Sequence, residues 1–141
     1  MTVQAILAPV FVMVALTFVL LFWMGGVRVA SVRRGETRVR DIALGQPNWP
    51  PRVQQISNCF HNQLQLPMLF YVLVILAYIL HKADLLFVIM SWIFVVLRVV
   101  HTAIHTGSNN VPRRFYAFLA GAIVLLLMWI IFAVRVLLGL G

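Results

Sequence analysis

The stretch from Thr2 to Gly26 contains no charged residue, and it constrains the fold more than any other feature of the sequence. A helix needs about 20 apolar residues to cross the hydrocarbon core of a bilayer. This stretch is long enough to do so. It is too long for a cleaved signal peptide and has no basic region before it. We therefore expect a retained membrane anchor at the start of the chain.

The composition extends this expectation to the whole chain. The hydrophobic residues make up 63% and the charged residues only 10% of the 141 residues, and the mean hydropathy is +1.02. Such proportions are typical of membrane proteins rather than water-soluble domains. Spans of about 20 residues each would leave room only for loops and ends. This excludes a second domain, a large soluble catalytic domain and a nucleotide-binding fold.

The distribution of apolar segments predicts an all-α integral membrane protein, a four-helix up-and-down transmembrane bundle formed by a single domain over residues 1–141. The expected spans are about 3–26, 53–80, 84–106 and 113–138, with one substantial loop at 27–52. Short connections favour antiparallel neighbours. The prolines at 47, 50 and 51 cannot continue a helix, whereas Pro112 is well placed as the first residue of the last helix.

The net charge of +8, from eleven basic and three acidic residues, indicates topology rather than nucleic-acid binding. Most of the arginines gather in two loops: Arg28, Arg33, Arg34, Arg38, Arg40 and Arg52 in the first, and Arg113 and Arg114 in the last. The positive-inside rule puts both loops in the cytoplasm and both termini on the non-cytoplasmic side. We interpret the membrane as a bacterial cytoplasmic membrane. The lone Cys59 cannot form an internal disulfide.

Polar residues persist inside two apolar spans, where they are costly unless they face a bundle interior or a wet cavity. Arg98, His101, Thr102 and His105 are spaced i, i+3, i+4 and i+7, which is one face of a helix. Asn58, Asn62 and Gln65 form a similar stripe on the second span. Both stripes lie level with Arg113 and Arg114. The convergence predicts a site for an anionic ligand with many hydrogen-bonding groups.

The same residues also admit simpler interpretations. Arg98 and the histidines could only bridge helices through buried hydrogen bonds. The arginines at the last loop could only set topology and contact lipid headgroups, and loop arginines 33, 34, 38 and 40 are most simply anchors to anionic lipids. The four tryptophans fit interface or packing positions rather than a cofactor site. The convergence of two independent polar stripes favours a ligand site.

One block, from Arg98 to Arg114, resembles a known family. It reads Arg98-Val-Val-His101-Thr102-Ala-Ile-His105-Thr-Gly107-Ser-Asn-Asn110-Val-Pro112-Arg113-Arg114. The block is similar to the third helix, short loop and fourth-helix start of the membrane-associated proteins in eicosanoid and glutathione metabolism, the MAPEG family. Ser31-Val32-Arg33-Arg34 resembles the end of that family's first helix, and the segment from Arg52 to Pro67 resembles its second.

The resemblance, to a microsomal glutathione transferase-like bacterial member, implies a homotrimer that binds glutathione as co-substrate between subunits. Arg114 matches the arginine that stabilises the glutathione thiolate, and so is the expected catalytic residue. The resemblance gives pocket roles to Asn58, Asn62, Gln65, Arg98, His101, His105 and Arg113, and it lets Arg34 reach the ligand from a neighbouring chain. No metal site is implied. The family's helix-two glutamate is absent, a common tyrosine is His105, and a basic loop residue is Asn110.

Three classes of function follow from these observations. The first is a glutathione-dependent membrane transferase or peroxidase that acts on hydrophobic electrophiles, with membrane lipids as neighbours. The second is a non-catalytic lipid-binding or scaffold trimer of the same fold. The third is a metal-dependent membrane oxidoreductase using His101, His105 and His61, which lacks the membrane-embedded carboxylate that an iron site favours.

Overall fold

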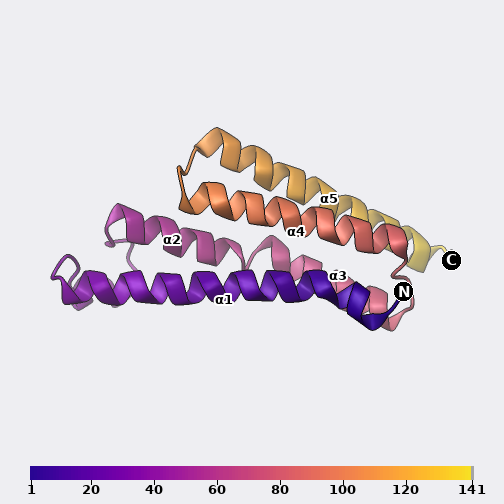
Figure 1. Ribbon diagram of the computed structural model, residues 1–141, viewed down its shortest axis with the longest axis horizontal. Helices are drawn as coiled ribbons and strands as arrows, with labels where there is room; N and C mark the ends of the chain where they lie inside the picture. The colour runs from indigo at the N-terminus through magenta and orange to yellow at the C-terminus, as the bar shows by residue number, and fades with distance from the viewer. Residues whose placement is uncertain (141) are drawn as a thin grey trace.

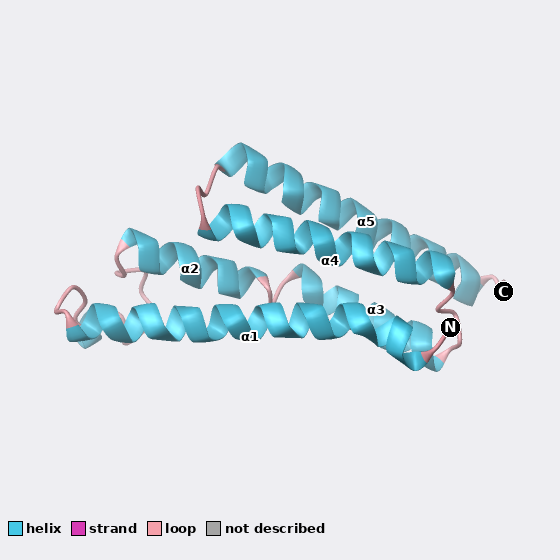
Figure 2. Ribbon diagram, viewed as in Figure 1, coloured by secondary structure: helices cyan, strands magenta, loops and turns pink. Residues whose placement is uncertain are grey.

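The computed structural model describes residues 1–140, which form an all-helical bundle (Figure 1). Its elements are α1 (Val3–Arg33), the 3-10 turn η1 (Val39–Asp41), α2 (Pro51–Asn62), α3 (Leu66–Ile79), α4 (Leu85–Thr106) and α5 (Val111–Leu137). In Figures 1 and 2, α4 and α5 run as a pair beside α1, α2 and α3. The two termini lie at one end, together with the α3–α4 connection. The expected up-and-down four-helix architecture is confirmed.

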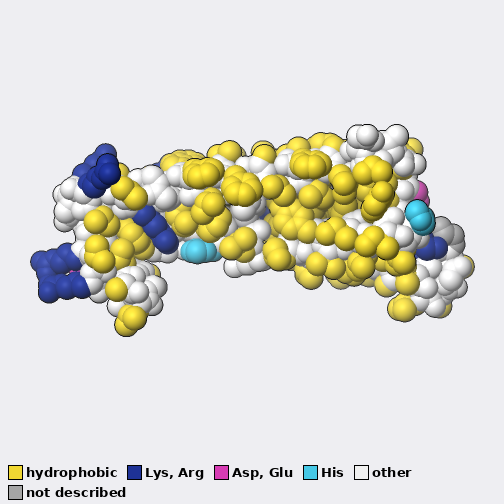
Figure 3. All heavy atoms as spheres, turned by 90° about the horizontal axis from the view of Figure 1, so that it is seen from below, with side chains coloured by type: hydrophobic (Ala, Val, Ile, Leu, Met, Phe, Trp, Pro, Cys, Tyr) yellow, Lys and Arg dark blue, Asp and Glu magenta, His cyan; other side chains and the backbone are white. Residues whose placement is uncertain are grey.

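Four helical segments are long and apolar enough to cross a membrane: Val3–Arg33, Pro51–Ile79, Leu85–Thr106 and Val111–Leu137. Exposed hydrophobic side chains cover the middle of the face drawn in Figure 3, and lysine and arginine side chains gather mainly at one end. Within the bundle, the core includes Met13, Phe70, Phe94 and Leu125. An apolar middle between polar ends matches the layers of a bilayer. The chain is an integral membrane protein.

The first helix extends beyond the expected span end at residue 26 and stops at Arg33. No helix-breaking residue follows Gly26 until Gly35, whose φ of 75° is left-handed. The backbone N–H of Gly35 donates to the carbonyl of Val32 at 3.1 Å, which closes the last turn. The first arginine after the apolar stretch, Arg28, therefore lies within the helix, and the helix ends only at Arg33.

The second span is interrupted, although the sequence suggested one helix over 53–80. Helix α2 ends at Asn62 and α3 begins at Leu66. Pro67 has no N–H to donate to the carbonyl four residues earlier, so the helical ladder fails at this point. The side chain of Gln63 is fully buried at the break. Its Nε2 donates to the carbonyl of Cys59 at 3.2 Å and to Oγ1 of Thr102 at 3.3 Å, which ties the break to α4.

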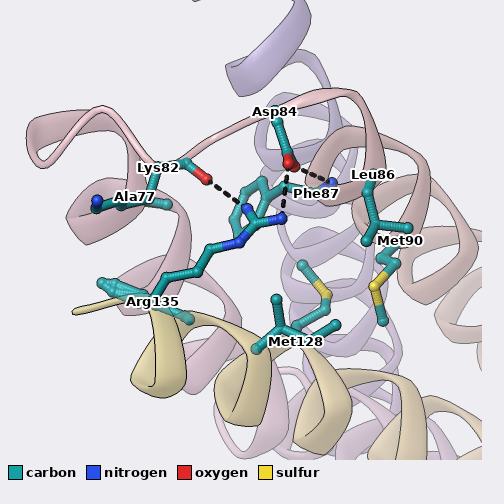
Figure 4. Close-up of a pocket in the computed structure, with 10 residues that line it drawn as sticks. Ala77, Lys82, Asp84, Leu86, Phe87, Met90, Met128 and Arg135 are labelled. Carbon is teal, nitrogen blue, oxygen red and sulfur yellow. Dashed lines mark hydrogen bonds and ion pairs between the residues drawn. The ribbon is translucent and has the colours of Figure 1, made fainter. Parts of the chain in front are cut away.

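At the end of the bundle that holds the termini, an ion pair fastens the α3–α4 connection to α5 (Figure 4). Nη2 of Arg135 lies 2.7 Å from Oδ2 of Asp84, and Nη1 donates to the carbonyl of Lys82 at 3.3 Å. The other carboxylate oxygen of Asp84 accepts the backbone N–H of Phe87 at 2.9 Å and caps α4. The hydrogen bond from Arg135 is the main cause that lowers the pKa of Asp84.

Candidate functional site

A cleft of about 450 Å³ opens between α2, α4 and α5, next to the loop that joins α4 to α5. Most of the expected site residues line it. The predicted residues in its wall are Asn58, Asn62, Gln65, His101, His105 and Arg114. Because α4 and α5 are antiparallel neighbours joined by a short loop, the last turn of α4 and the first turn of α5 meet at this end of the bundle.

Helix α2 and the break after it bring amide side chains to the cleft. Asn58 is exposed, and its Oδ1 accepts a hydrogen bond from Nε2 of Gln54 at 2.7 Å. Gln65 lies in the break with φ −99° and ψ −105°, so it is not a continuation of the α2 stripe. It still reaches the cleft because the chain turns there before α3 begins. The two amide side chains offer exposed donors and acceptors at the open side.

Helix α4 supplies two buried histidines. His101 is 2% exposed and His105 is 5% exposed, and their ring centroids are 5.5 Å apart in an edge-to-face arrangement. The Nδ1 atoms of both rings are buried without a hydrogen-bond partner in residues 1–140. Nε2 of Gln55 donates to the backbone carbonyls of His105 at 2.7 Å and of Gly107 at 3.1 Å, which holds α2 against the end of α4. The histidine wall therefore carries hydrogen-bonding capacity that is not used within the chain.

Helix α5 places a guanidinium group in the cleft. It begins at Val111 after Asn110, whose side-chain oxygen accepts the N–H of Arg113 at 3.2 Å. Pro112 is the second residue of α5, one position after the first position that was expected for it. Arg114 is partly buried, lines the cleft and donates from Nη1 to Oδ1 of Asn109 at 2.8 Å.

The comparison with protein families decides the identity of this arrangement. The MAPEG family model matches residues 6–134. This chain belongs to the MAPEG family. The match covers most of every candidate span and all the residues of the cleft, so the resemblance of the block from Arg98 to Arg114 is confirmed. No curated protein and no solved structure matches the chain.

Arg98 is not among the residues that line the cleft of this MAPEG protein, and its contacts are those of a residue that supports the cleft. It is 1% exposed and lies behind the cleft. Its Nη2 donates to the backbone carbonyl of Asn62 at 3.3 Å and to Oδ1 of the same residue at 2.5 Å. Nε and Nη1 of Arg98 are buried without a partner among the described residues. Arg98 therefore supports the end of α2 instead of forming the cleft surface.

Arg34 and Arg113 do not line the cleft either. Arg113 is exposed on the first turn of α5, and only its backbone N–H takes part in the helix cap. Arg34 is exposed at the end of α1. Within a single copy of this MAPEG chain, the cleft holds one of the three expected arginines at helix ends, Arg114.

The cleft also contains residues that the sequence interpretation did not select. Val111, Phe115 and Phe118 form an apolar wall on α5. His61, which the sequence suggested only as a third histidine for a metal site, adds a further polar group from α2. The ring centroid of Phe118 lies 6.0 Å from that of His101. The spacing of Val111, Arg114 and Phe118 at three and four residues is the signal that could have identified this face of α5.

The charge of the cleft is not balanced by acidic side chains. The acidic residues of the chain are Glu36, Asp41 and Asp84, and none lines the cleft. In the described part of the chain, no group of three or more His, Cys, Asp or Glu side chains could hold a metal ion. The cleft of this MAPEG protein therefore combines a cation, amide groups and imidazoles, which suits an anionic ligand with peptide-like hydrogen-bonding groups.

Proposed function

We propose that this MAPEG protein is a glutathione-dependent membrane transferase or peroxidase that acts on hydrophobic electrophiles. The observation that carries the proposal is the position of Arg114, which faces the same cleft as the amides of α2 and the histidines of α4. The cleft volume of about 450 Å³ is within the range of small-molecule sites. Glutathione has two carboxylates and two peptide groups, which match these donors and acceptors.

Arg114 would act on the thiol of glutathione. A fixed guanidinium beside a thiol favours the thiolate, which is the nucleophilic form. In a transferase reaction the thiolate sulfur attacks an electrophilic carbon, a carbon–sulfur bond forms, and the leaving group departs with its electron pair.

We further propose that the chain works as a homotrimer with the cleft between subunits. In a single copy, His61, Asn58 and Gln65 are exposed within a span. Polar side chains at membrane depth are costly when they face lipid. A second copy over the cleft would cover them, and Arg34 of the covering chain would approach the ligand. The arginine-rich loops would be cytoplasmic and both termini non-cytoplasmic, in accordance with the positive-inside rule.

A direct test combines binding with turnover. Purified protein in neutral detergent would be titrated with glutathione by calorimetry, and conjugation would be followed with a chlorodinitrobenzene, from which the thiolate displaces chloride. We expect saturable glutathione binding and a thiol-dependent rate above the uncatalysed reaction. Absence of glutathione binding by the assembled protein would contradict the proposal. A conservative variant, Arg114→Lys, keeps the charge without the planar donor arrangement and should be intermediate between the parent and Arg114→Ala.

A non-catalytic lipid-binding protein is the second candidate, and an apolar groove favours it. The groove has a volume of about 440 Å³ and lies between α3 and α5; it is lined by Leu66, Leu69, Ala122, Leu125, Leu126 and Trp129. Under the first proposal this groove would admit the hydrophobic electrophile from the bilayer. Under the second it would hold only lipid. Retained lipid together with no glutathione binding and no conjugation would favour the second candidate.

A further inference from the structure

A separate groove lies at the arginine-rich end of α1, away from the cleft. It has a volume of about 340 Å³ and is lined by Arg28, Val29, Val32, Arg33 and Trp49. Trp49 belongs to the segment just before α2, which folds back against the last turns of α1. The groove thus combines two cationic side chains with valines and one flat aromatic side chain.

The guanidinium of Arg28 is held in place from two sides. Its Nε donates to Oγ of Ser57 on α2 at 3.1 Å. Its Cζ lies 4.8 Å from the centroid of the Trp49 ring, which is a cation–π contact. Within residues 1–140 we find no hydrogen bond from either Nη atom of Arg28. The two Nη groups of Arg28 therefore have no partner in the described part of the chain, on a side chain that is already held at Nε and over Trp49.

The groove has positive charge without an acidic partner in the described part of the chain. Asp41 lies near Arg40, with 4.0 Å between Oδ1 and Nε, and the other ion pair joins Asp84 to Arg135 at the opposite end. Neither pair includes Arg28 or Arg33. An anion that binds here would meet uncompensated guanidinium groups, which pair well with phosphate oxygens.

The position of the groove along α1 indicates where that anion comes from. With 31 residues, α1 is about 46 Å long at a rise of about 1.5 Å per residue. The hydrocarbon core is only about 30 Å thick, so the last turns of α1 extend into the headgroup layer. Val29 is 52% exposed beside the arginines. A ligand that carries both a phosphate and an acyl chain fits this mixed surface better than a free anion does.

We propose that Arg28, Arg33 and Trp49 form a binding site for an anionic phospholipid, with the phosphate on the two guanidinium groups and the upper acyl chain against Val29 and Val32. Ser57 is on α2, and Trp49 is in the loop that precedes α2. A bound lipid would therefore connect this loop, α1 and α2 at this end of the bundle. The site is separate from the cleft and does not depend on glutathione chemistry.

The test uses the full-length protein in neutral detergent. Dioctanoyl phosphatidylglycerol, dioctanoyl phosphatidylcholine and inorganic phosphate would be titrated separately, and tryptophan fluorescence would be followed in the parent and in Trp49→Phe. We expect a saturable response to phosphatidylglycerol that requires Trp49, with a much weaker response to phosphatidylcholine. Arg28→Gln should weaken the binding at least about tenfold through loss of a charge-assisted hydrogen bond.

Two further variants keep the test decisive. Arg33→Gln changes an exposed side chain, so it separates lost binding from misfolding if Arg28→Gln is unstable. Arg40→Gln is the matched control, because Arg40 is outside the groove and should leave binding unchanged. Equal responses to the two phospholipids, or unchanged affinity in both groove variants, would overturn the proposal. An equal response to inorganic phosphate would assign the site to a free anion and overturn the lipid assignment.

Discussion

Nη1 of Arg114 donates a hydrogen bond to Oδ1 of Asn109 across the loop between α4 and α5, over 2.8 Å. Asn109 has a left-handed φ of 51°, and its backbone N–H donates to the carbonyl of Ile104 at 2.8 Å. The loop is thus closed on α4 while its side chain holds the guanidinium of α5. Arg113, the residue just before Arg114, has an exposed side chain outside the cleft. This difference leads to the first two predictions.

Arg114→Ala should lower glutathione conjugation by about 10 to 150-fold, because loss of one charge-assisted hydrogen bond costs about 1.5 to 3 kcal/mol. It should also raise the pKa of the bound thiol, since the positive charge that favours the thiolate is gone. Rates measured against pH would show both effects. Arg113→Ala should change much less. Equal activity of Arg114→Ala and the parent, with glutathione binding verified, would contradict the mechanism.

Asn109→Gly should reduce conjugation by up to about tenfold, because glycine keeps the left-handed backbone and removes only the acceptor that positions Arg114. The expected change is in the pH profile of the rate rather than in the assembly of the protein. Asn109→Ala removes the same oxygen and adds backbone strain, so it should lose roughly 1 kcal/mol more stability than the glycine variant. If Asn109→Gly leaves the pH profile unchanged, Asn109 does not position Arg114 during turnover.

Arg98→Ala should destabilise the bundle by about 1.5 to 3 kcal/mol, because the carbonyl and side-chain oxygens of Asn62 lose a charged donor at the helix break. Thermal unfolding in detergent would measure the loss. Arg98→Lys should recover only part of it, since an ammonium group replaces a planar one with several donors. If the alanine variant is as stable as the parent, Arg98 does not stabilise the break between α2 and α3.

The oligomeric state gives a prediction that does not depend on whether the protein is catalytically active. The exposed polar face of α2 should be covered by neighbouring copies in the membrane. Mass measurement of the detergent-solubilised protein should therefore find three chains. A change of Asn58 to leucine would make this face more lipid-compatible and should leave a larger fraction of monomer if the face is an interface. A stable monomer of the parent would remove the intersubunit site.

The ion pair between Asp84 and Arg135 should make stability depend on acid pH. The pKa of Asp84 is lowered from its ordinary value of 3.8, chiefly by the Arg135 hydrogen bond. A carboxylate with a lowered folded pKa stabilises the fold above 3.8, and this contribution is lost as the pH falls toward the folded value. The Asp84 carboxylate is 49% exposed, so solvent screening limits the effect to about 1 kcal/mol or less.

Asp84→Asn is the variant that tests this contribution, because asparagine can still cap α4 through its side-chain oxygen. Its unfolding midpoint should be lower than that of the parent at neutral pH, and the difference should shrink as the pH falls below the ordinary pKa of 3.8. Asp41→Asn is the control, since Asp41 lies 4.0 Å from Arg40 in an exposed pair. The same pH dependence in parent and Asp84→Asn would contradict the assignment.

Many of the residues that line the cleft could be predicted from local patterns in the sequence. His101 and His105 are four residues apart on one helix, so their common face depends only on the helical period. Asn58 and Asn62 share a face of α2 for the same reason. The loop proline and the short connection placed Arg114 near the end of α4. These residues line the cleft. Two antiparallel helices joined by a short loop must bring the end of one next to the start of the other.

The sequence by itself determined the membrane class, the number of spans and the faces that carry polar residues, because hydropathy and helical periodicity are local properties of the chain. Only the tertiary structure decided which arginine enters the cleft. Arg34, Arg98 and Arg114 are all next to polar or loop segments, but packing leaves Arg34 exposed, buries Arg98 against Asn62 and directs Arg114 to the cleft. The physical reason is that a long flexible cation takes the direction that its neighbours in space leave open, and those neighbours come from other helices.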